Sequence, residues 1–332
     1  MKRVLVTGGA GYVGGVLVPH LLSSGYAVTV YDIMFFSREG LPNHPNLTMV
    51  EGDIRDTPRL ARAFESIDVV LHLACISNDP SFELDEAFSR TINFECFEPM
   101  VVAAKDAGVA RFVYCSTSSV YGVSDSPDVT EEHPLVPLTF YNKYKGLCEP
   151  LLFRHQASDF VCVTIRPATI CGYSPRMRLD LTVNTLTNHA VNARKITVFG
   201  GSQSRPNLHI ADMADAYQLM IEAPAEKIAG EIFNVGYQNM TIARIAEVVR
   251  GVVQEEFPDR GEVEIVTTPS NDPRSYHINS DKVRRVLGYA PKRTVQDAVR
   301  DLCRAFREGR LPNSLEDERY FNVRRMKALA AV

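Results

Sequence analysis

The sequence predicts an α/β fold in which a doubly wound, mostly parallel sheet carries helices on both faces, followed by a smaller C-terminal region. Short apolar runs alternate with helix-like stretches through the first half of the chain, as right-handed β-α-β crossovers require. A glycine-rich turn directly follows the first apolar run. After Pro167 the apolar runs shorten, and proline, arginine and asparagine become frequent. We therefore expect a larger domain over residues 1–170 and a smaller region over 171–332, with the chain free to cross back between them.

The apolar runs of the first half contain many β-branched residues and few polar interruptions, which is typical of strands buried on both faces. In such sheets the ligand lies at the carboxyl ends of the strands. The charged tail beyond residue 312 is expected to wrap the surface or fray. The expected strands are 4–6, 27–31, 47–50, 68–74, 111–116, 160–166, 196–199 and 231–235. One helix is expected to begin at Tyr12, and further helical regions are expected at 84–107, 141–157, 211–221 and 242–253.

The glycine-rich turn has the spacing of a Rossmann-type dinucleotide-binding motif. Gly8 permits the tight bend, Gly11 lets the backbone approach a pyrophosphate, and Gly14 lets the helix pack on the strand. The phosphates would lie at the positive N-terminus of the helix that begins at Tyr12. The alternative is a tight strand-to-helix turn that binds nothing.

An acidic residue stands where the motif requires one, at the end of the second strand. The Asp32 carboxylate can accept hydrogen bonds from both ribose hydroxyls and would repel a 2′-phosphate, which favours NAD over NADP. An ordinary strand-end aspartate is the alternative. Arg38 lies nearby in the sequence and could meet a phosphate.

Composition excludes several classes of function. The net charge of −4 gives no basic surface for nucleic acid or for an anionic membrane. No apolar run is long enough to span a membrane, and the first strand begins so early that we expect no signal peptide. The 7 cysteines form an odd set without a C-x-x-C pair, which predicts reduced thiols in a cytoplasmic protein and neither disulfides nor a metal site.

A tyrosine and a lysine four residues apart could supply catalysis. The spacing places Tyr141 and Lys145 on one face of the helix expected at 141–157. A nearby ammonium favours the phenolate, which can act as a base toward a substrate hydroxyl. A solvated helix face is the alternative. The polar run that begins at Ser116 ends the preceding strand, where a hydroxyl could hold a substrate oxygen.

Together these residues resemble the extended short-chain dehydrogenase/reductase family, which comprises NAD-dependent nucleotide-sugar epimerases and dehydratases. The resemblance runs along nearly the whole chain. The matching positions are the turn at 8–14, Asp32, 52–54, 71–74, Asn93, 116–117 with 120–122, Tyr141 with Lys145, 166–167, Arg205 with 210–212, 234–236 and Arg274 with 280–282.

The resemblance implies a role for each matching residue. Tyr141 would be the catalytic base, Lys145 would hold the nicotinamide ribose and tune Tyr141, and Thr117 would bond the reacting sugar hydroxyl. Asp53 and Ile54 would meet the adenine. The cofactor site as a whole would comprise Gly8, Gly11, Tyr12, Val13, Asp32, Asp53, Ile54, Leu73, Ala74, Asn93, Tyr141, Lys145 and Pro167. The substrate site would comprise Ser77, Thr117, Ser118, Thr169, Arg178, Arg205 and Arg274. Arg205 and Arg274 would clamp the diphosphate of the sugar nucleotide.

The chain departs from the family pattern at two places. The 4,6-dehydratases carry Asp-Glu directly after the catalytic threonine, whereas Ser118 and Ser119 stand here, so we expect no dehydratase activity. Many 4-epimerases have an asparagine where this chain has Thr169. The loop at 174–181 resembles that of bacterial enzymes that oxidise GDP-linked heptoses at C4, as does the neighbourhood of Asp272 and Pro273.

The resemblance implies hydride abstraction from C4 of a nucleotide-diphosphate sugar by NAD⁺, with 4-epimerisation as the outcome if the hydride returns. A 4-dehydrogenase that releases the keto-sugar, for example from GDP-heptose, is an alternative with the same first step. A non-catalytic NAD-binding sensor is an alternative of another class. The resemblance also implies a homodimer through the helix that carries Tyr141, where Leu147, Leu151, Leu152 and Phe153 are apolar.

Overall fold

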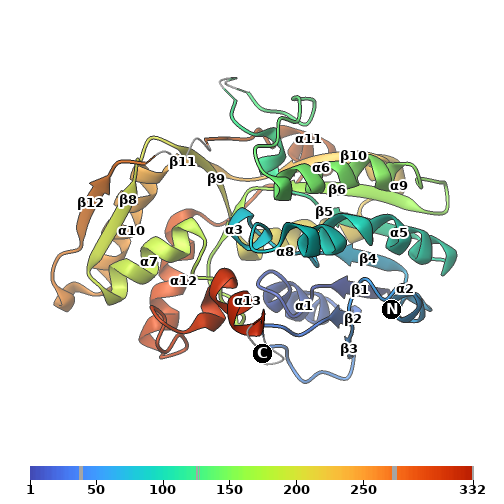
Figure 1. Ribbon diagram of the computed structural model, residues 1–332, viewed down its shortest axis with the longest axis horizontal. Coiled ribbons are helices and arrows are strands. Elements are labelled where there is room, and N and C mark those ends of the chain that lie inside the picture. Colours follow the sequence, from blue (N-terminus) through green and yellow to red (C-terminus); the bar gives the residue numbers. More distant parts are fainter. Residues whose placement is uncertain (37–39, 125, 127, 271–274, 331–332) are drawn as a thin grey trace.

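The computed structural model describes residues 1–36, 40–124, 126, 128–270 and 275–330. Its main body is a seven-stranded sheet in the order β10-β6-β5-β4-β1-β2-β3, and a smaller body lies beside it (Figure 1). All six pairings in the sheet are parallel, so the doubly wound Rossmann-type fold is confirmed. The strands are β1 (Arg3–Thr7), β2 (Ala27–Asp32), β3 (Leu47–Glu51), β4 (Val69–His72), β5 (Arg111–Cys115), β6 (Val161–Pro167) and β10 (Glu231–Val235).

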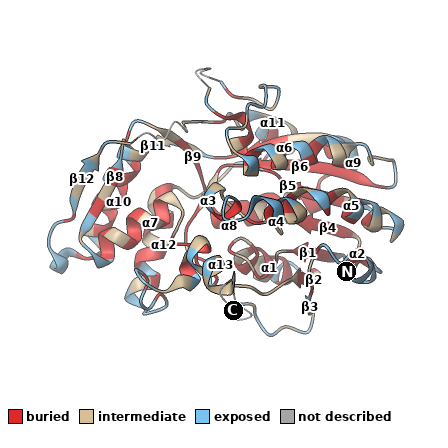
Figure 2. Ribbon diagram, in the orientation of Figure 1, coloured by how far each residue is buried: buried red, intermediate tan, exposed pale blue. Residues whose placement is uncertain are grey.

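Alternate residues of each strand face opposite helical layers. In β1, Val4 and Val6 belong to a core cluster that includes α1 and α8, whereas Leu5 belongs to a second cluster with α2, α5 and α6. The sheet is therefore buried on both faces (Figure 2). The helices of the two layers are α1 (Gly14–Ser23), α8 (Ile210–Glu222), α2 (Thr57–Phe64), α5 (Phe97–Asp106) and α6 (Phe140–Phe153).

The C-terminal region contributes to the main body before it ends the chain. Strand β10 pairs with β6, and α8 covers the sheet beside α1, so the chain crosses back after residue 170. The smaller body has its own apolar core, built by residues such as Val198, Val249 and Val299. Its elements are α7 (Thr182–Asn192), α10 (Ile242–Glu256), α12 (Val295–Arg307), and the strands β7 (Thr169–Cys171), β8 (Lys195–Phe199), β9 (Ser204–His209), β11 (Gln238–Thr241) and β12 (Glu264–Thr268).

The long helical region expected over 84–107 is confirmed, but it contains a π-helical turn. Asp85 caps α4 (Glu86–Arg90), which leads into a π-helical stretch at Thr91–Glu95 and then into α5. The Cys96 N–H bonds to the Thr91 carbonyl, five residues back, at 3.2 Å. This wider turn carries the buried Asn93, and such insertions often accompany functional sites.

The tail beyond residue 312 is packed, so of the two expected outcomes, wrapping the surface or fraying, the structure shows the first as far as residue 330. Tyr320 belongs to a core cluster with Tyr12 and Leu179, and Asn322 at the start of α13 (Asn322–Ala330) is buried. In Figure 1 this helix lies against the front of the molecule, between the two bodies. Among the described residues, no helix has the length and apolar character needed to cross a membrane.

Candidate functional site

A cavity of about 780 Å³ runs from the glycine turn to the smaller body. It opens at the carboxyl ends of the parallel strands, where a doubly wound fold binds its ligands. Every expected cofactor residue except Asn93 lines it, as does every expected substrate residue that the structure describes. Arg274, Arg38, Asp272 and Pro273 lie outside the described residues.

The glycine turn has the geometry that a bound dinucleotide needs. Gly8 adopts φ +73°, and a Cβ there would lie 2.7 Å from the Ala74 nitrogen, so a side chain would collide with the backbone that follows β4. A Cβ on Gly11 would lie 3.0 Å from the Gly8 carbonyl oxygen. Both positions line the cavity, and the turn leads directly into α1. The backbone is thus bare where a pyrophosphate would approach.

Asp32 lies beside this turn at the end of β2. Its Oδ2 accepts the Ala10 N–H at 3.0 Å, and its Oδ1 accepts the Met34 N–H at 2.9 Å. Burial raises the pKa of the carboxyl, while these two hydrogen bonds act in the opposite direction. Each carboxylate oxygen keeps a second lone pair for a ribose hydroxyl.

Of the remaining expected cofactor residues, Asn93 lies behind the cavity and the others line it. Asn93 holds Ile76 through two hydrogen bonds, Nδ2 to the Ile76 carbonyl at 2.9 Å and the Ile76 N–H to Oδ1 at 2.8 Å. It therefore positions the loop after β4 from outside the cavity. The residues that line the cavity itself are Tyr12, Val13, Asp53, Ile54, Leu73, Ala74 and Pro167.

The hydroxyl groups after β5 form a connected set. Thr117 Oγ1 lies 2.8 Å from Ser119 Oγ, and Ser119 Oγ donates to Asn142 Oδ1 on α6 at 2.5 Å. Ser118 is buried and also contributes to the wall. Because Asn142 follows Tyr141 on α6, this set ties the strand-end hydroxyls to the helix that carries the expected base.

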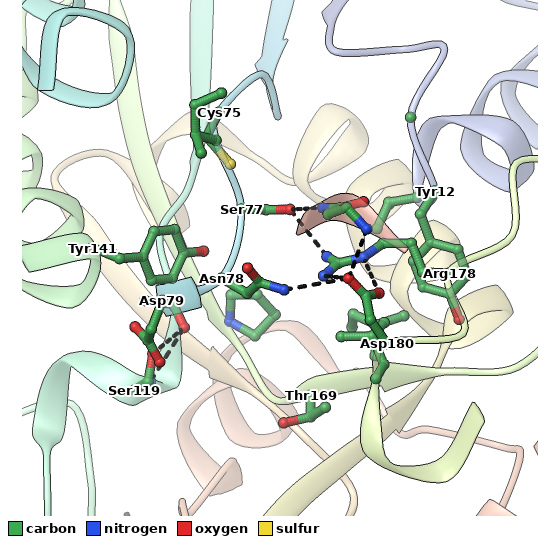
Figure 3. A pocket seen from close by; sticks show the side chains of 18 of the residues that line it. Tyr12, Cys75, Ser77, Asn78, Asp79, Ser119, Tyr141, Thr169, Arg178 and Asp180 are labelled. Carbon is green, nitrogen blue, oxygen red and sulfur yellow. Dashed lines mark hydrogen bonds and ion pairs between the residues drawn. The ribbon is translucent and has the colours of Figure 1, made fainter. Parts of the chain in front are cut away.

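Tyr141 directs its hydroxyl into the cavity (Figure 3). Burial raises its pKa well above the ordinary value, and interactions with Cys75 and Cys115 act in the same direction. Lys145 Nζ donates to the Cys115 carbonyl and lies 4.8 Å from the centre of the Tyr114 ring. The role expected of Lys145, to hold the nicotinamide ribose and favour the Tyr141 phenolate, stays a prediction.

A buried polar cluster closes the opposite wall of the cavity. Arg178 donates to both carboxylate oxygens of Asp180, at 2.9 and 3.2 Å, and to Ser77 Oγ at 3.0 Å (Figure 3). Asn322 from the tail donates to the same Ser77 oxygen at 3.0 Å. Each nitrogen of the Arg178 guanidinium thus donates at least one hydrogen bond inside the protein. Nothing in the local sequence around Asn322 indicates this position.

The far end of the cavity lies in the smaller body. Arg205 on β9 is buried, and its guanidinium lies 5.2 Å from the centre of the Tyr276 ring. Thr169 on β7 lines the stretch between this end and Tyr141. The cavity therefore has room for one ligand along the glycine turn and a second toward Arg205.

The sequence has a clear family match. A model of the NAD dependent epimerase/dehydratase family matches residues 4–236. The chain belongs to this family. Like other members of this epimerase/dehydratase family it uses NAD, and the bare turn at Gly8 and the acceptors of Asp32 fit that dinucleotide.

Several curated epimerase/dehydratase relatives align along most of the chain. The low-salt glycan biosynthesis protein Agl12 of Haloferax volcanii is 30% identical over 309 residues, which cover 89% of this chain and 96% of that protein. A UDP-glucose 4-epimerase of Lactobacillus helveticus is 28% identical, covering 90% and 94%. A dTDP-glucose 4,6-dehydratase of Streptomyces griseus is 29% identical, covering 90% and 92%.

Solved structures of epimerase/dehydratase proteins share the fold. The dTDP-glucose 4,6-dehydratase DesIV of Streptomyces venezuelae, with NAD bound, has a TM-score of 0.81 at 26% identity and covers 93% of this chain and 98% of that one. A UDP-glucose 4-epimerase of Thermus thermophilus in complex with NAD has a TM-score of 0.80 at 23% identity, covering 92% and 99%. Epimerases and dehydratases thus resemble this chain about equally, and the site has to distinguish them.

Proposed function

We propose that the protein is a nucleotide-sugar 4-epimerase that oxidises the C4 hydroxyl and then reduces the keto-sugar from the opposite face. The observation that carries the proposal is that Tyr141, Thr117 and the glycine turn line one cavity, which continues to Arg205. A sugar held between these ends would present its ring to Tyr141, and its diphosphate to the Arg205 guanidinium.

The chain's own residues supply positioning and proton transfer. Tyr141 accepts the proton of the C4 hydroxyl, and Thr117, joined to Ser119, hydrogen-bonds the same oxygen. Lys145 fixes the end of β5 through the Cys115 carbonyl, next to the base. Bound NAD⁺ supplies the hydride acceptor and a positive charge near the phenol. Epimerisation also requires the keto-sugar to rotate before the proton and hydride return, within the cavity that Thr169 lines.

The residues after Thr117 support epimerisation over loss of water. Ser118 and Ser119 occupy the positions of the dehydratase acid and base, and Ser119 is already hydrogen-bonded to Thr117 and Asn142. Asp79 is the carboxylate in the cavity that acts on Tyr141, and its Oδ1 accepts the Thr139 hydroxyl at 2.6 Å. Asp79 lies on the Tyr141 side of the cavity, whereas Asp180 is paired with Arg178 in the opposite wall.

A 4-dehydrogenase that releases the keto-sugar is a second candidate. The loop at 174–181 supports it through its sequence; in the structure this loop carries the buried Arg178–Asp180 pair and contacts Ser77. The sequence of this loop resembles that of the corresponding loop in bacterial enzymes that oxidise GDP-linked heptoses at C4. Both candidates begin with the same proton and hydride removal.

Product analysis distinguishes these reactions. We expect the NAD-containing protein, incubated with UDP-, GDP-, dTDP- and CDP-linked sugars, to interconvert one pair of C4 epimers without net NADH formation. NMR of the products and absorbance of NADH provide the two readouts. Accumulation of a 4-keto sugar with NADH would identify the dehydrogenase instead. A 4-keto-6-deoxy product would contradict the assignment.

We also propose that the protein forms a homodimer through α6. Phe140 and Leu147 lie two helical turns apart on one face of α6 and are 43% and 40% exposed. Val102 on the neighbouring α5 is 38% exposed. Of the other apolar residues expected at this face, Leu152 is buried in the core against the sheet. Exposed apolar side chains on adjacent helices support burial against a second copy.

Sedimentation velocity tests the dimer. The wild-type protein is expected to sediment as a dimer at micromolar concentration, and Leu147→Asp as a monomer, because a charge in the centre of the interface is desolvated without a partner. Leu315→Asp, at an exposed apolar position in the tail, is the matched control and should remain dimeric. A monomeric wild type, or a dimeric Leu147→Asp variant, would show that α6 does not form such an interface.

A further inference from the structure

Arg176 is a buried arginine in the wall of the cavity. It lies in the loop between β7 and α7, is only 5% exposed, and its guanidinium stacks 3.8 Å from the centre of the Phe36 ring. Both side chains line the cavity. The arginine therefore belongs to the C-terminal region in sequence but lies against the loop that follows β2.

Its hydrogen bonding is incomplete. Nη2 donates to Asn322 Oδ1 at 2.6 Å, whereas Nε and Nη1 are buried and have no acceptor among the described residues. Burial and the neighbouring Arg178 charge lower its pKa to about 9, which still leaves the group charged near neutral pH. A buried cation with unpaired donors is costly, and a phosphate matches the two free N–H directions of a guanidinium.

The nearby carboxylates are already engaged. Asp180 accepts from Arg178, and its Oδ2 also accepts the Asn322 N–H at 3.1 Å. Asp32 acts on Arg176 through its charge, but its two oxygens accept backbone N–H groups of the glycine turn and of Met34. Neither carboxylate is bonded to the free nitrogens of Arg176.

The loop that carries Arg176 is hydrogen-bonded to the glycine turn. Ser174 Oγ donates to the Tyr12 carbonyl at 2.7 Å, and Tyr12 Oη donates to the Gly172 carbonyl at 2.7 Å. A Cβ on Gly15 would lie 2.8 Å from Ser174 Oγ and 3.6 Å from the Arg176 nitrogen. The loop thus packs directly on the first turn of α1, where the dinucleotide phosphates are expected.

We propose that Arg176 binds the NAD pyrophosphate and that Asn322 orients it. The glycine turn would approach the pyrophosphate from one side, and the guanidinium would approach from the side of the smaller body. The adenosine part of NAD carries no charge, and Asp32 would repel a 2′-phosphate. The pyrophosphate is therefore the anionic group of the cofactor that fits Arg176. The inference concerns cofactor binding alone and holds whichever sugar reaction the protein performs.

Binding measurements on the full-length protein test this role. For Arg176→Met, the dissociation constants of NADH, followed by its fluorescence, and of ADP-ribose, followed by competition, are expected to rise about 10- to 100-fold. The dissociation constant of adenosine should stay within about twofold. Asn322→Ala should weaken the same two ligands by a smaller factor. Arg304→Met, at an exposed position on α12, is the matched control and should change none of these constants.

The thermal midpoint without nucleotide separates ligand binding from a structural role. Because methionine removes an unpaired buried cation, the midpoint of Arg176→Met should equal or exceed that of the wild type, while the shift produced by ADP-ribose should shrink. Unchanged NADH and ADP-ribose affinity would overturn the proposal. An equal loss for adenosine would also overturn it, because Arg176 would then shape the adenosine pocket. Loss confined to the nucleotide sugar would assign the residue to the substrate.

Discussion

Tyr141→Phe is expected to lower turnover by about 10³-fold while NADH affinity stays within about twofold. Phenylalanine keeps the ring that fills the cavity wall but cannot accept the proton of the sugar hydroxyl. Rates with the identified nucleotide sugar and NADH titrations give the two measurements. Tyr144→Phe on the same helix is the matched control, since its ring packs on Phe82 and Phe94 and it does not line the cavity.

The pH dependence gives a second readout of the same base. Burial raises the pKa of Tyr141, so the phenol is mostly protonated near neutral pH and its active, deprotonated form increases with pH. Turnover of the wild type is therefore expected to rise with pH through the neutral range, and the residual turnover of Tyr141→Phe should lose this rise. Wild-type turnover in Tyr141→Phe would mean that another group removes the proton.

Glu149→Met is expected to reduce the free energy of unfolding by about 3–5 kcal/mol. Glu149 on α6 pairs with Arg166 on β6 at 2.6 Å, both side chains are 3% exposed, and Ser116 Oγ donates to the same carboxylate at 2.6 Å. Burial lowers the pKa of Arg166, whereas Glu149 raises it, so the variant leaves the guanidinium buried without the carboxylate that stabilises its charge. Urea denaturation measures the loss.

Two further variants separate an unpaired charge from a lost contact. The double variant Glu149→Met with Arg166→Met should regain most of the stability, because apolar groups of similar size replace the whole pair. Glu247→Met, which removes an exposed ion pair with Arg250 on α10, should cost no more than about 0.5–1 kcal/mol. A loss below about 1 kcal/mol for Glu149→Met would show that water reaches Arg166.

Local sequence patterns were sufficient to predict the strand, turn and helix that form the cofactor site. The glycine turn and Asp32 lie within one β-α-β unit, whose geometry follows from strand, turn and helix in sequence order. The π-helical turn at Thr91–Glu95 could not be predicted in this way. It depends on where Asn93 meets Ile76 in the folded protein, and a π-helical turn has no strong sequence signal.

Fold class, family, cofactor and candidate catalytic residues could all be predicted from short-range patterns, because each depends on spacings of a few residues along one strand or helix. The way in which the cavity is closed depends instead on long-range packing. Ser77 and Asn322 are 245 residues apart, and Arg176 and Asn322 are 146 apart, yet each pair is hydrogen-bonded. No short-range pattern encodes such contacts, since they arise when the smaller body and the tail pack against the glycine turn.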